Sequence, residues 1–178
     1  MGRAKALLPI GDTSFIRRIA ASLLTGGAAS VTVVVGRHAA EISAHLRETD
    51  LRVIEHAGWD TGRTGSLQAG LRALPHDSAG VLLALTDMPW FRADTLRTLL
   101  TAFHAHPEAD FCAPRYGERH GHPIALRRTL FDDIAALGPD APLRDLLRTR
   151  RRVSVDVDDP GVLHDANTPE DLSGDTRS

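Results

Sequence analysis

The stretch Val-Leu-Leu-Ala-Leu-Thr-Asp-Met-Pro, residues 81–89, decides the fold. A short continuous apolar run that ends in polar residues and proline is typical of a buried strand in a parallel sheet. Ligands of open α/β sheets bind beyond the carboxyl ends of such strands, and Asp87 follows this strand directly. A carboxylate in that position is a candidate ligand for Mg²⁺, which usually takes one or two protein carboxylates together with phosphates and water. An alternative role for Asp87, as the cap of the next helix, stays open, although the strand before it favours the metal.

Patterns of strand and helix alternate along the rest of the chain. Apolar runs bounded by turn-forming residues predict further strands, and helical periodicity separates them. The alternation predicts a Rossmann-like α/β fold with a mostly parallel sheet and helices on both faces. The expected strands are 31–35, 52–55, 81–85, 110–113, 123–126 and 153–157, and the expected helices are 14–24, 39–46, 66–74, 93–104, 130–137 and 143–150.

Length and composition restrict the class of protein. The 178 residues are 42% hydrophobic and 25% charged, which suits one buried core and is too small for two independent domains. We therefore expect one domain over residues 1–172 and a polar tail over 173–178. A net charge of -2 offers no basic footprint for nucleic acid, and no apolar stretch reaches the roughly 20 residues that span a bilayer. We expect no nucleic-acid partner, no membrane partner and a cytoplasmic location.

A second cluster of oxygen-bearing side chains lies in Leu-His-Asp-Ala-Asn-Thr-Pro-Glu-Asp-Leu, residues 163–172. Thr168, the proline after it and the two acids form an ordinary helix start. That interpretation leaves Asp165 and Asn167 available to a cation shared with Asp87. Both interpretations can hold together, and we treat Asp165 and Asn167 as one joint prediction.

The chain carries a single lysine, Lys5, among its 21 strongly basic residues. Lysine is a compact point charge suited to a phosphate cluster, whereas arginine is a planar fork suited to bidentate pairing. A lone lysine can also survive by chance, so Lys5 decides nothing by itself.

The glycine-rich segment 58–70 runs into a helix, where N–H groups and the Ser66 hydroxyl are suited to an anion or nucleotide. Such loops also simply turn the chain.

Two histidines flank a glycine in Arg-His-Gly-His-Pro, residues 119–123. Two histidines without a third ligand do not complete a zinc site, so we favour a role in lining a pocket. The arginines of residues 144–152 are interpreted as a solvated helix face.

Taken together, these motifs resemble those of the MobA-like molybdopterin nucleotidyltransferases, and within that family the cytidylyltransferase branch. The family has a strand, the loop Leu-Ala-Ala-Gly-x-Ser-x-Arg-Met-Gly-x-x-Lys and then Leu-Leu, and residues 1–9 match its second half. The match continues in the family's order through residues 62–70, 87–89, 121–123 and 165–171. It spans nearly the whole chain, although each motif is only moderately specific.

The resemblance implies a glycosyltransferase-A-like fold and transfer of a nucleoside monophosphate from an NTP, with CTP favoured, to a molybdopterin-type phosphorylated acceptor, releasing pyrophosphate. It also implies Mg²⁺ as cofactor and a molybdoenzyme or its maturation factor as a partner. A sugar-phosphate or other small acceptor stays an alternative, as does a non-catalytic homologue that binds nucleotide or a partner. Carried over by position, the implied residues are Lys5 and Asp87 for catalysis; Gly2, Lys5, Gly65, Ser66 and Asp87 for the nucleotide; Gly121, His122 and Pro123 for the acceptor; and Asp87, Asp165 and Asn167 for the metal.

Departures from the family pattern accompany the match. The family's first strand and the first half of its loop have no counterpart ahead of Met1, so we expect a start codon placed too late, with a genuine N-terminal truncation as the rival. Loss of a central strand predicts an exposed apolar sheet edge, weak stability and a tendency to associate. Residues 138–144 disturb the family's Gly-Asp-x-Gly-x-Arg motif, which puts the acceptor contacts in question, and Asn167 stands where the branch commonly has Asp.

Overall fold

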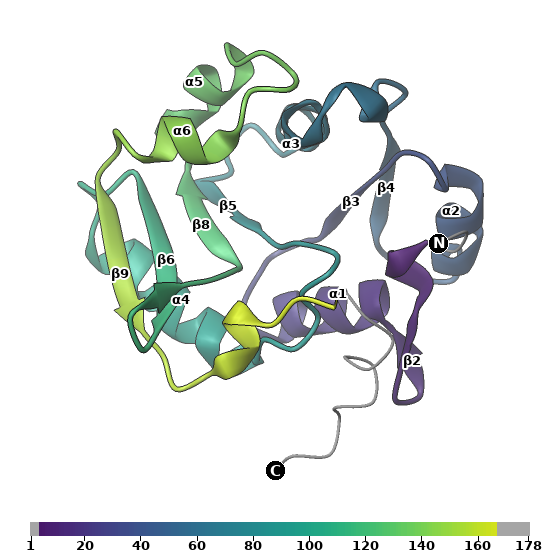
Figure 1. Ribbon diagram of the computed structural model, residues 1–178, viewed down its shortest axis with the longest axis horizontal. Coiled ribbons are helices and arrows are strands. Elements are labelled where there is room, and N and C mark those ends of the chain that lie inside the picture. The colour runs from purple at the N-terminus through teal and green to yellow at the C-terminus, as the bar shows by residue number, and fades with distance from the viewer. Residues whose placement is uncertain (1–3, 167–178) are drawn as a thin grey trace.

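The computed structural model describes residues 4–166, in which strands and helices alternate (Figure 1). The strands are β1 (Pro9–Ile10), β2 (Thr13–Ser14), β3 (Thr32–Val35), β4 (Arg52–Glu55), β5 (Gly80–Leu83), β6 (Phe111–Tyr116), β7 (Arg119–His120), β8 (Ile124–Arg127) and β9 (Arg152–Asp156). The α-helices are α1 (Phe15–Thr25), α2 (Ala39–Leu46), α3 (Arg63–Arg72), α4 (Ala93–Ala105), α5 (Phe131–Ala135) and α6 (Leu143–Leu147). Short 3₁₀ turns are η1 (Lys5–Leu7), η2 (Trp59–Thr61), η3 (Arg128–Leu130) and η4 (Pro160–Leu163).

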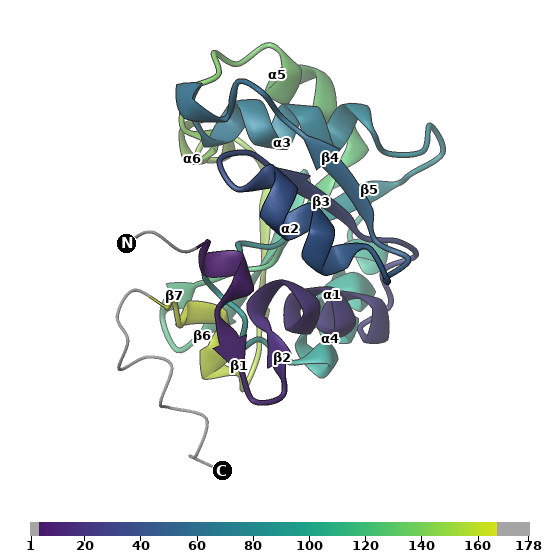
Figure 2. The same cartoon turned by 90° about the vertical axis from the view of Figure 1, so that its right-hand side faces the viewer.

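Helices cover the strands on both faces, which confirms the α/β class (Figures 1 and 2). Helices α1 and α4 pack together on one face, and α3 packs with α5 on the other. Helix α1 forms because Ile16, Ile19 and Leu23 recur at helical spacing and bury one stripe. None of the helices within residues 4–166 has the length and apolar character needed to cross a membrane.

Pairing in the larger sheet is mixed, which corrects the expectation of a mostly parallel sheet. In this sheet β6 and β9 pair in parallel, whereas β8 runs antiparallel to both β5 and β6. Strands β3 and β4, in a separate two-stranded sheet, are also parallel. The strand order is β5-β8-β6-β7, with β9 on β6. The sheet is mixed because the chain reverses direction after β6, forms the short antiparallel strand β7, and then places β8 between β5 and β6.

Strand β5 has an unusual environment for a strand in the middle of the molecule. Its apolar residues 81–83 are all only half-buried, whereas Phe111–Tyr116 and Ile124–Arg127 begin with runs of fully buried residues. Within residues 4–166, β5 has β8 as its only paired neighbour, and β3 and β4 form a separate two-stranded sheet. The central sheet is therefore interrupted between β3 and β5.

Element boundaries differ from the expectations in several places: β5 ends at Leu83 and α6 at Leu147, before the expected ends at 85 and 150, and β6 continues to Tyr116, past the expected end at 113. Helix α3 begins at Arg63, before the expected start at residue 66, and the helix expected at 130–137 divides into η3 and the short α5. Sequence analysis did not find the β1–β2 hairpin, because two-residue strands show no periodicity. Its turn contains Gly11, whose φ of 57° is readily adopted only by glycine.

Leu126 on β8 offers a test of the core that packs against the larger sheet. Its side chain is fully buried in a cluster with Phe111 and Ile134, so Leu126→Ala leaves a cavity that the packed sheet cannot close. We expect the free energy of unfolding to fall by about 2–5 kcal/mol in urea denaturation. Leu24→Ala, at a side chain that is 45% exposed, should cost less than about 1 kcal/mol. Equal losses in the two variants would contradict this core.

Candidate active site

Hydrogen bonds hold the carboxyl end of β5 to segments that lie far away in the sequence. The N–H of Ala166 donates to the carbonyl of Asp87, with an N–O distance of 2.7 Å. The carbonyl of Ala166 in turn accepts a hydrogen bond from Nζ of Lys5 at 3.0 Å. Because Asp165 adjoins Ala166, the structure brings together three of the predicted site residues: Lys5, Asp87 and Asp165.

The position of Lys5 follows from its neighbours. Ala4 and Ala6 on either side are buried in one apolar cluster with Val33 and Val35 of β3. The lysine side chain extends from there to Ala166, beside the carboxyl end of β5. Its ammonium group therefore lies where ligands of α/β sheets bind, and it suits an anionic ligand.

Oxygen-bearing side chains at this position suit a hard divalent cation. Asp87 is half-buried and Asp165 is exposed, and carboxylates are preferred ligands of Mg²⁺ and similar ions. Within residues 4–166 no three histidine, cysteine or acidic side chains gather into a complete metal site. Asn167 and Gly2, the other residues predicted for the metal and the nucleotide, lie outside the described residues. The two described carboxylates fit part of the expected donor set.

The predicted acceptor segment packs beside the same strand end. A Cβ added at Gly121 would lie 2.0 Å from the carbonyl oxygen of Val162, so this close approach requires glycine. The N–H of His122 donates to the same Val162 carbonyl at 2.9 Å. Pro123 is fully buried. These contacts fix the segment against η4.

The imidazole of His122 faces β5. Its Nδ1 lies 3.4 Å from the carbonyl oxygen of Leu83. Burial lowers the pKa of His122 below its ordinary value of 6.5, although the contact with Leu83 and the charge of Asp87 act in the opposite direction. A neutral imidazole is therefore favoured beside the Asp87 carboxylate.

The two histidines of segment 119–123 do not converge on a metal. Nε2 of His120 pairs with Oγ of Ser154 at 2.8 Å, whereas His122 contacts Leu83. This arrangement agrees with a role in shaping the walls of a site.

A buried carboxylate that sequence analysis did not single out anchors η4. Asp159 accepts hydrogen bonds from the N–H of Arg92 at 2.8 Å, the hydroxyl of Thr95 at 2.6 Å and the N–H of Gly161 at 3.0 Å. This carboxylate therefore links the start of α4 to the turn that carries Val162 against Gly121. The Asp-Pro-Gly motif at 159–161 is the signal that could have identified it.

An aromatic stack also escaped sequence analysis. The rings of Trp90 and His164 stack with centroids 4.3 Å apart and planes at 19°, and Phe15 meets Trp90 edge-on at 5.7 Å. Trp90 follows Asp87 in the chain, and His164 directly precedes Asp165. The stack therefore holds the two acidic segments beside each other. No local pattern pairs residues this far apart.

Gly65 and Ser66 belong to a second group, at the start of α3. Gly62 precedes this helix with φ of 139°, a conformation that requires glycine. The glycine-rich sequence suggested that the N–H of Gly65 is available to a ligand. In the structure this N–H donates to the carbonyl of Pro139 at 3.3 Å. Thr64 likewise donates to Ala141 at 2.5 Å. Segment 139–141 therefore lies directly against this helix start. Ser66, in the same turn, is half-buried.

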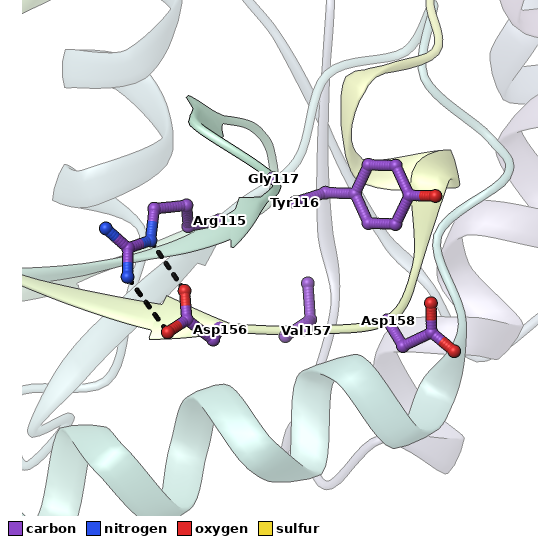
Figure 3. Close-up of a pocket in the computed structure, with 6 residues that line it drawn as sticks. All are labelled: Arg115, Tyr116, Gly117, Asp156, Val157 and Asp158. Atoms are coloured by element: carbon purple, nitrogen blue, oxygen red, sulfur yellow. Dashed lines mark hydrogen bonds and ion pairs between the residues drawn. The ribbon is translucent and has the colours of Figure 1, made fainter.

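An open depression of about 470 Å³ lies at the carboxyl ends of β6 and β9, and Figure 3 shows the residues that line it. There Arg115 donates two hydrogen bonds to Asp156, at 2.5 and 2.9 Å. These bonds lower the pKa of the Asp156 carboxyl below its usual range. Because the pair is exposed, it adds little to stability. We interpret it as an interaction that helps to keep β6 and β9 in register.

The fold defines an α/β protein, and its candidate ligand site lies beyond the carboxyl end of β5. The chain belongs to the MobA-like NTP transferase domain family, whose model matches residues 1–155. This family comprises nucleotidyltransferases. No curated protein matches the chain.

Solved structures show the same fold. Rv0371c from Mycobacterium tuberculosis H37Rv, in a complex with manganese, is 27% identical with a TM-score of 0.75, covering 97% of this chain and 91% of that chain. A nucleotidyl transferase from Methanothermobacter thermautotroptrophicus is 26% identical with a TM-score of 0.80, covering 95% and 82%. A CMP:2-keto-3-deoxy-manno-octonic acid synthetase complexed with CTP is 15% identical with a TM-score of 0.76, covering 97% and 90%, and shows the fold alone.

Asp159 should be important for the stability of this region. Asp159→Asn replaces a carboxylate that accepts three hydrogen bonds, and we expect the free energy of unfolding to fall by about 2 kcal/mol in urea denaturation. The adjacent Asp158→Asn is the matched control, because Asp158 is exposed and should change stability by less than about 0.5 kcal/mol. Indistinguishable variants would contradict the anchoring role.

The depressed pKa of His122 predicts a pH dependence of stability. The stability contributed by this neutral imidazole is present above about pH 6.5 and is lost as the pH falls through the lower folded-state pKa. Replacing the histidine by a neutral side chain, His122→Gln, should therefore reduce the loss of unfolding free energy between about pH 7.5 and about pH 5.5. The exposed His76→Gln serves as control for the same chemical change. If His122→Gln leaves the acid sensitivity of the parent unchanged, this assignment is wrong.

Proposed function

We propose that the chain is an Mg²⁺-dependent nucleotidyltransferase that transfers cytidine monophosphate from CTP to a molybdopterin-type phosphorylated acceptor. The observation that carries the proposal is the meeting of Lys5, Asp87 and residues 165–166 at the carboxyl end of β5, in a chain of a nucleotidyltransferase family. The manganese complex of a structural neighbour that is 27% identical supports a divalent metal.

The reaction needs alignment more than a side-chain nucleophile. An oxygen of the acceptor phosphate attacks the α-phosphorus of CTP and forms a new P–O bond, while the bond to the bridging oxygen of the β-phosphate breaks. Pyrophosphate carries away the electron pair. Catalysis then consists of holding the two phosphates in line and neutralising the charge that grows on pyrophosphate. The absence of a Ser-His-Asp arrangement from our sequence motifs agrees with this chemistry.

Each residue of the site has a corresponding proposed role. The ammonium of Lys5 neutralises charge on the leaving pyrophosphate. Asp87 and Asp165, with Asn167, hold Mg²⁺, which neutralises phosphate oxygens when bound. Segment 121–123 lines the acceptor side, next to the same strand end.

The remaining roles complete the nucleotide side of the proposal. Gly2, Gly65 and Ser66 contact the nucleotide, and for Gly65 this requires a contact other than its N–H, which donates to Pro139. We further propose one domain over residues 1–172, a cytoplasmic location, and a molybdoenzyme or its maturation factor as the recipient of the product.

Asp87→Asn tests the function. It keeps the size of the side chain and removes its charge, so we expect Mg²⁺-dependent pyrophosphate release with CTP and molybdopterin to fall by about 10²-fold. Asp94→Asn, at an exposed carboxylate in the first turn of α4, is the matched control and should keep the parent rate. Equal rates for Asp87→Asn and the parent would remove Asp87 from the site.

The acceptor and the nucleotide are tested in the same assay. GTP replaces CTP in one arm, and a sugar phosphate replaces molybdopterin in another. Release with a sugar phosphate alone would contradict the molybdopterin proposal, and release with GTP alone would contradict CTP. If the parent chain releases no pyrophosphate with any pair while calorimetry detects CTP binding, transfer is excluded and a nucleotide-binding homologue is supported.

A further inference from the structure

Trp59 is a large apolar side chain that is 40% exposed. Isolated exposed apolar side chains are common on protein surfaces and need no explanation. Trp59 differs from them in two ways: it lies at the edge of a sheet where ligands bind, and both its backbone and its ring are held in place by neighbouring residues.

The parallel pairing of β3 and β4 defines that edge. Thr32 pairs with Arg52 and Val35 pairs with Glu55, so the carboxyl ends of the two strands lie together. Beyond β4 the chain continues through η2, which contains Trp59, into α3 (Figure 1). Because ligands of α/β sheets bind beyond the carboxyl ends of the strands, Trp59 is in a position suited to ligand contact.

Hydrogen bonds hold the turn that carries Trp59. The N–H of His56 donates to the carbonyl of Val35 at 2.8 Å and so extends the pairing with β3 past the end of β4. The N–H and the hydroxyl of Thr61 both donate to the carbonyl of Gly58, at 3.2 and 2.7 Å. These bonds close the turn on either side of Trp59 and fix its backbone.

The ring of Trp59 is held by Gly36, which directly follows Val35. A Cβ added at Gly36 would collide with Cβ and Cγ of Trp59, so the tryptophan packs directly on the backbone at this point and requires glycine there. An aromatic side chain that is already fixed loses little conformational freedom when a ligand contacts it. Trp59 is therefore preorganised for binding.

Arg37 adds hydrogen-bond donors beside the ring. Its Cζ lies 5.7 Å from the ring centroid of Trp59. Elsewhere in the protein, Arg127 lies 4.0 Å from the ring centroid of Phe103 and also donates to three main-chain carbonyls. The guanidinium of Arg37 is exposed and makes no hydrogen bond or ion pair with the part of the chain that the structure describes. Its planar set of donors is therefore available to a ligand.

The platform formed by Gly36, Arg37 and Trp59 is linked to both groups of residues in the proposed site. Lys5 lies between two alanines of the apolar cluster that contains Val35, and Gly36 follows Val35. In the other direction along the chain, η2 leads through Gly62 into the start of α3, the segment proposed for the nucleotide.

From these observations we propose that the platform recognises a planar nitrogen heterocycle that carries a carbonyl group. The heterocycle stacks on the indole of Trp59, and Arg37 donates hydrogen bonds to its carbonyl oxygen. Two reactants contain such a ring, the base of CTP and the pterin of the acceptor. The inference rests on the proposed function for this choice of ligands, and it adds to that function a residue that determines specificity.

Calorimetry on Trp59→Ala tests the stacking contact with three probes: CTP with Mg²⁺, inorganic triphosphate with Mg²⁺, and free pterin. Affinity for the ring that uses the platform should fall by about tenfold or more, because the stacking contact is lost. Affinity for triphosphate, which has no ring, should stay that of the parent. Trp59→Tyr keeps an aromatic ring and should retain most of the affinity.

Two further variants complete the design. Tyr116→Ala removes another exposed aromatic side chain, 37% exposed at the end of β6, and should bind all three probes as the parent does. Arg37→Met keeps the length of the side chain and removes its donors, so it should weaken binding of the same heterocycle that Trp59→Ala weakens.

The probes distinguish the two sources of the ring. Loss of affinity for CTP alone assigns the platform to the base, and loss for pterin alone assigns it to the acceptor. Unchanged affinity for both rings in Trp59→Ala would overturn the proposal, as would an equal loss for triphosphate or failure of the parent to bind either ring.

Failure of this proposal is separable from failure of the proposed function. A chain that binds CTP or pterin through Trp59 but releases no pyrophosphate would contradict the transfer reaction and support the platform. If Trp59→Ala instead releases pyrophosphate at the parent rate, with both substrates below KM, the platform is wrong and the transfer reaction stands.

Discussion

Strand β5 is the constraint on which the rest of the structure depends. Its side chains alternate between two helical layers: Val81 and Leu83 pack in the cluster that contains residues of α3 and α5, and Leu82 packs with residues of α1 and α4. A strand covered on both faces has only its edges left for backbone pairing, and β5 has a partner on one edge alone within residues 4–166. The half-buried state of its apolar residues is the direct consequence.

The candidate site depends on the same strand. Asp87 is positioned by β5, Ala166 by its hydrogen bond to Asp87, and the Lys5 ammonium by Ala166. On the far side, His122 is placed against Leu83 of the same strand. Catalysis by alignment requires these groups to stay within a fraction of an ångström of their positions. A strand with an open edge is a weak support for that geometry, because its local opening costs little free energy.

Sequence analysis predicted the parts of the fold whose signals are local. The run at 81–85 is a clear signal because it is continuously apolar, and the stripe at 14–24 is clear because Ile16, Ile19 and Leu23 recur at helical spacing. The insertion of β8 between β5 and β6 was not predictable, since strand pairing joins segments with no shared local pattern. The same holds within the site: the resemblance identified Lys5 and Asp87, whereas the stack of Trp90 on His164 and the hydrogen bonds of Asp159 arise only from tertiary contact.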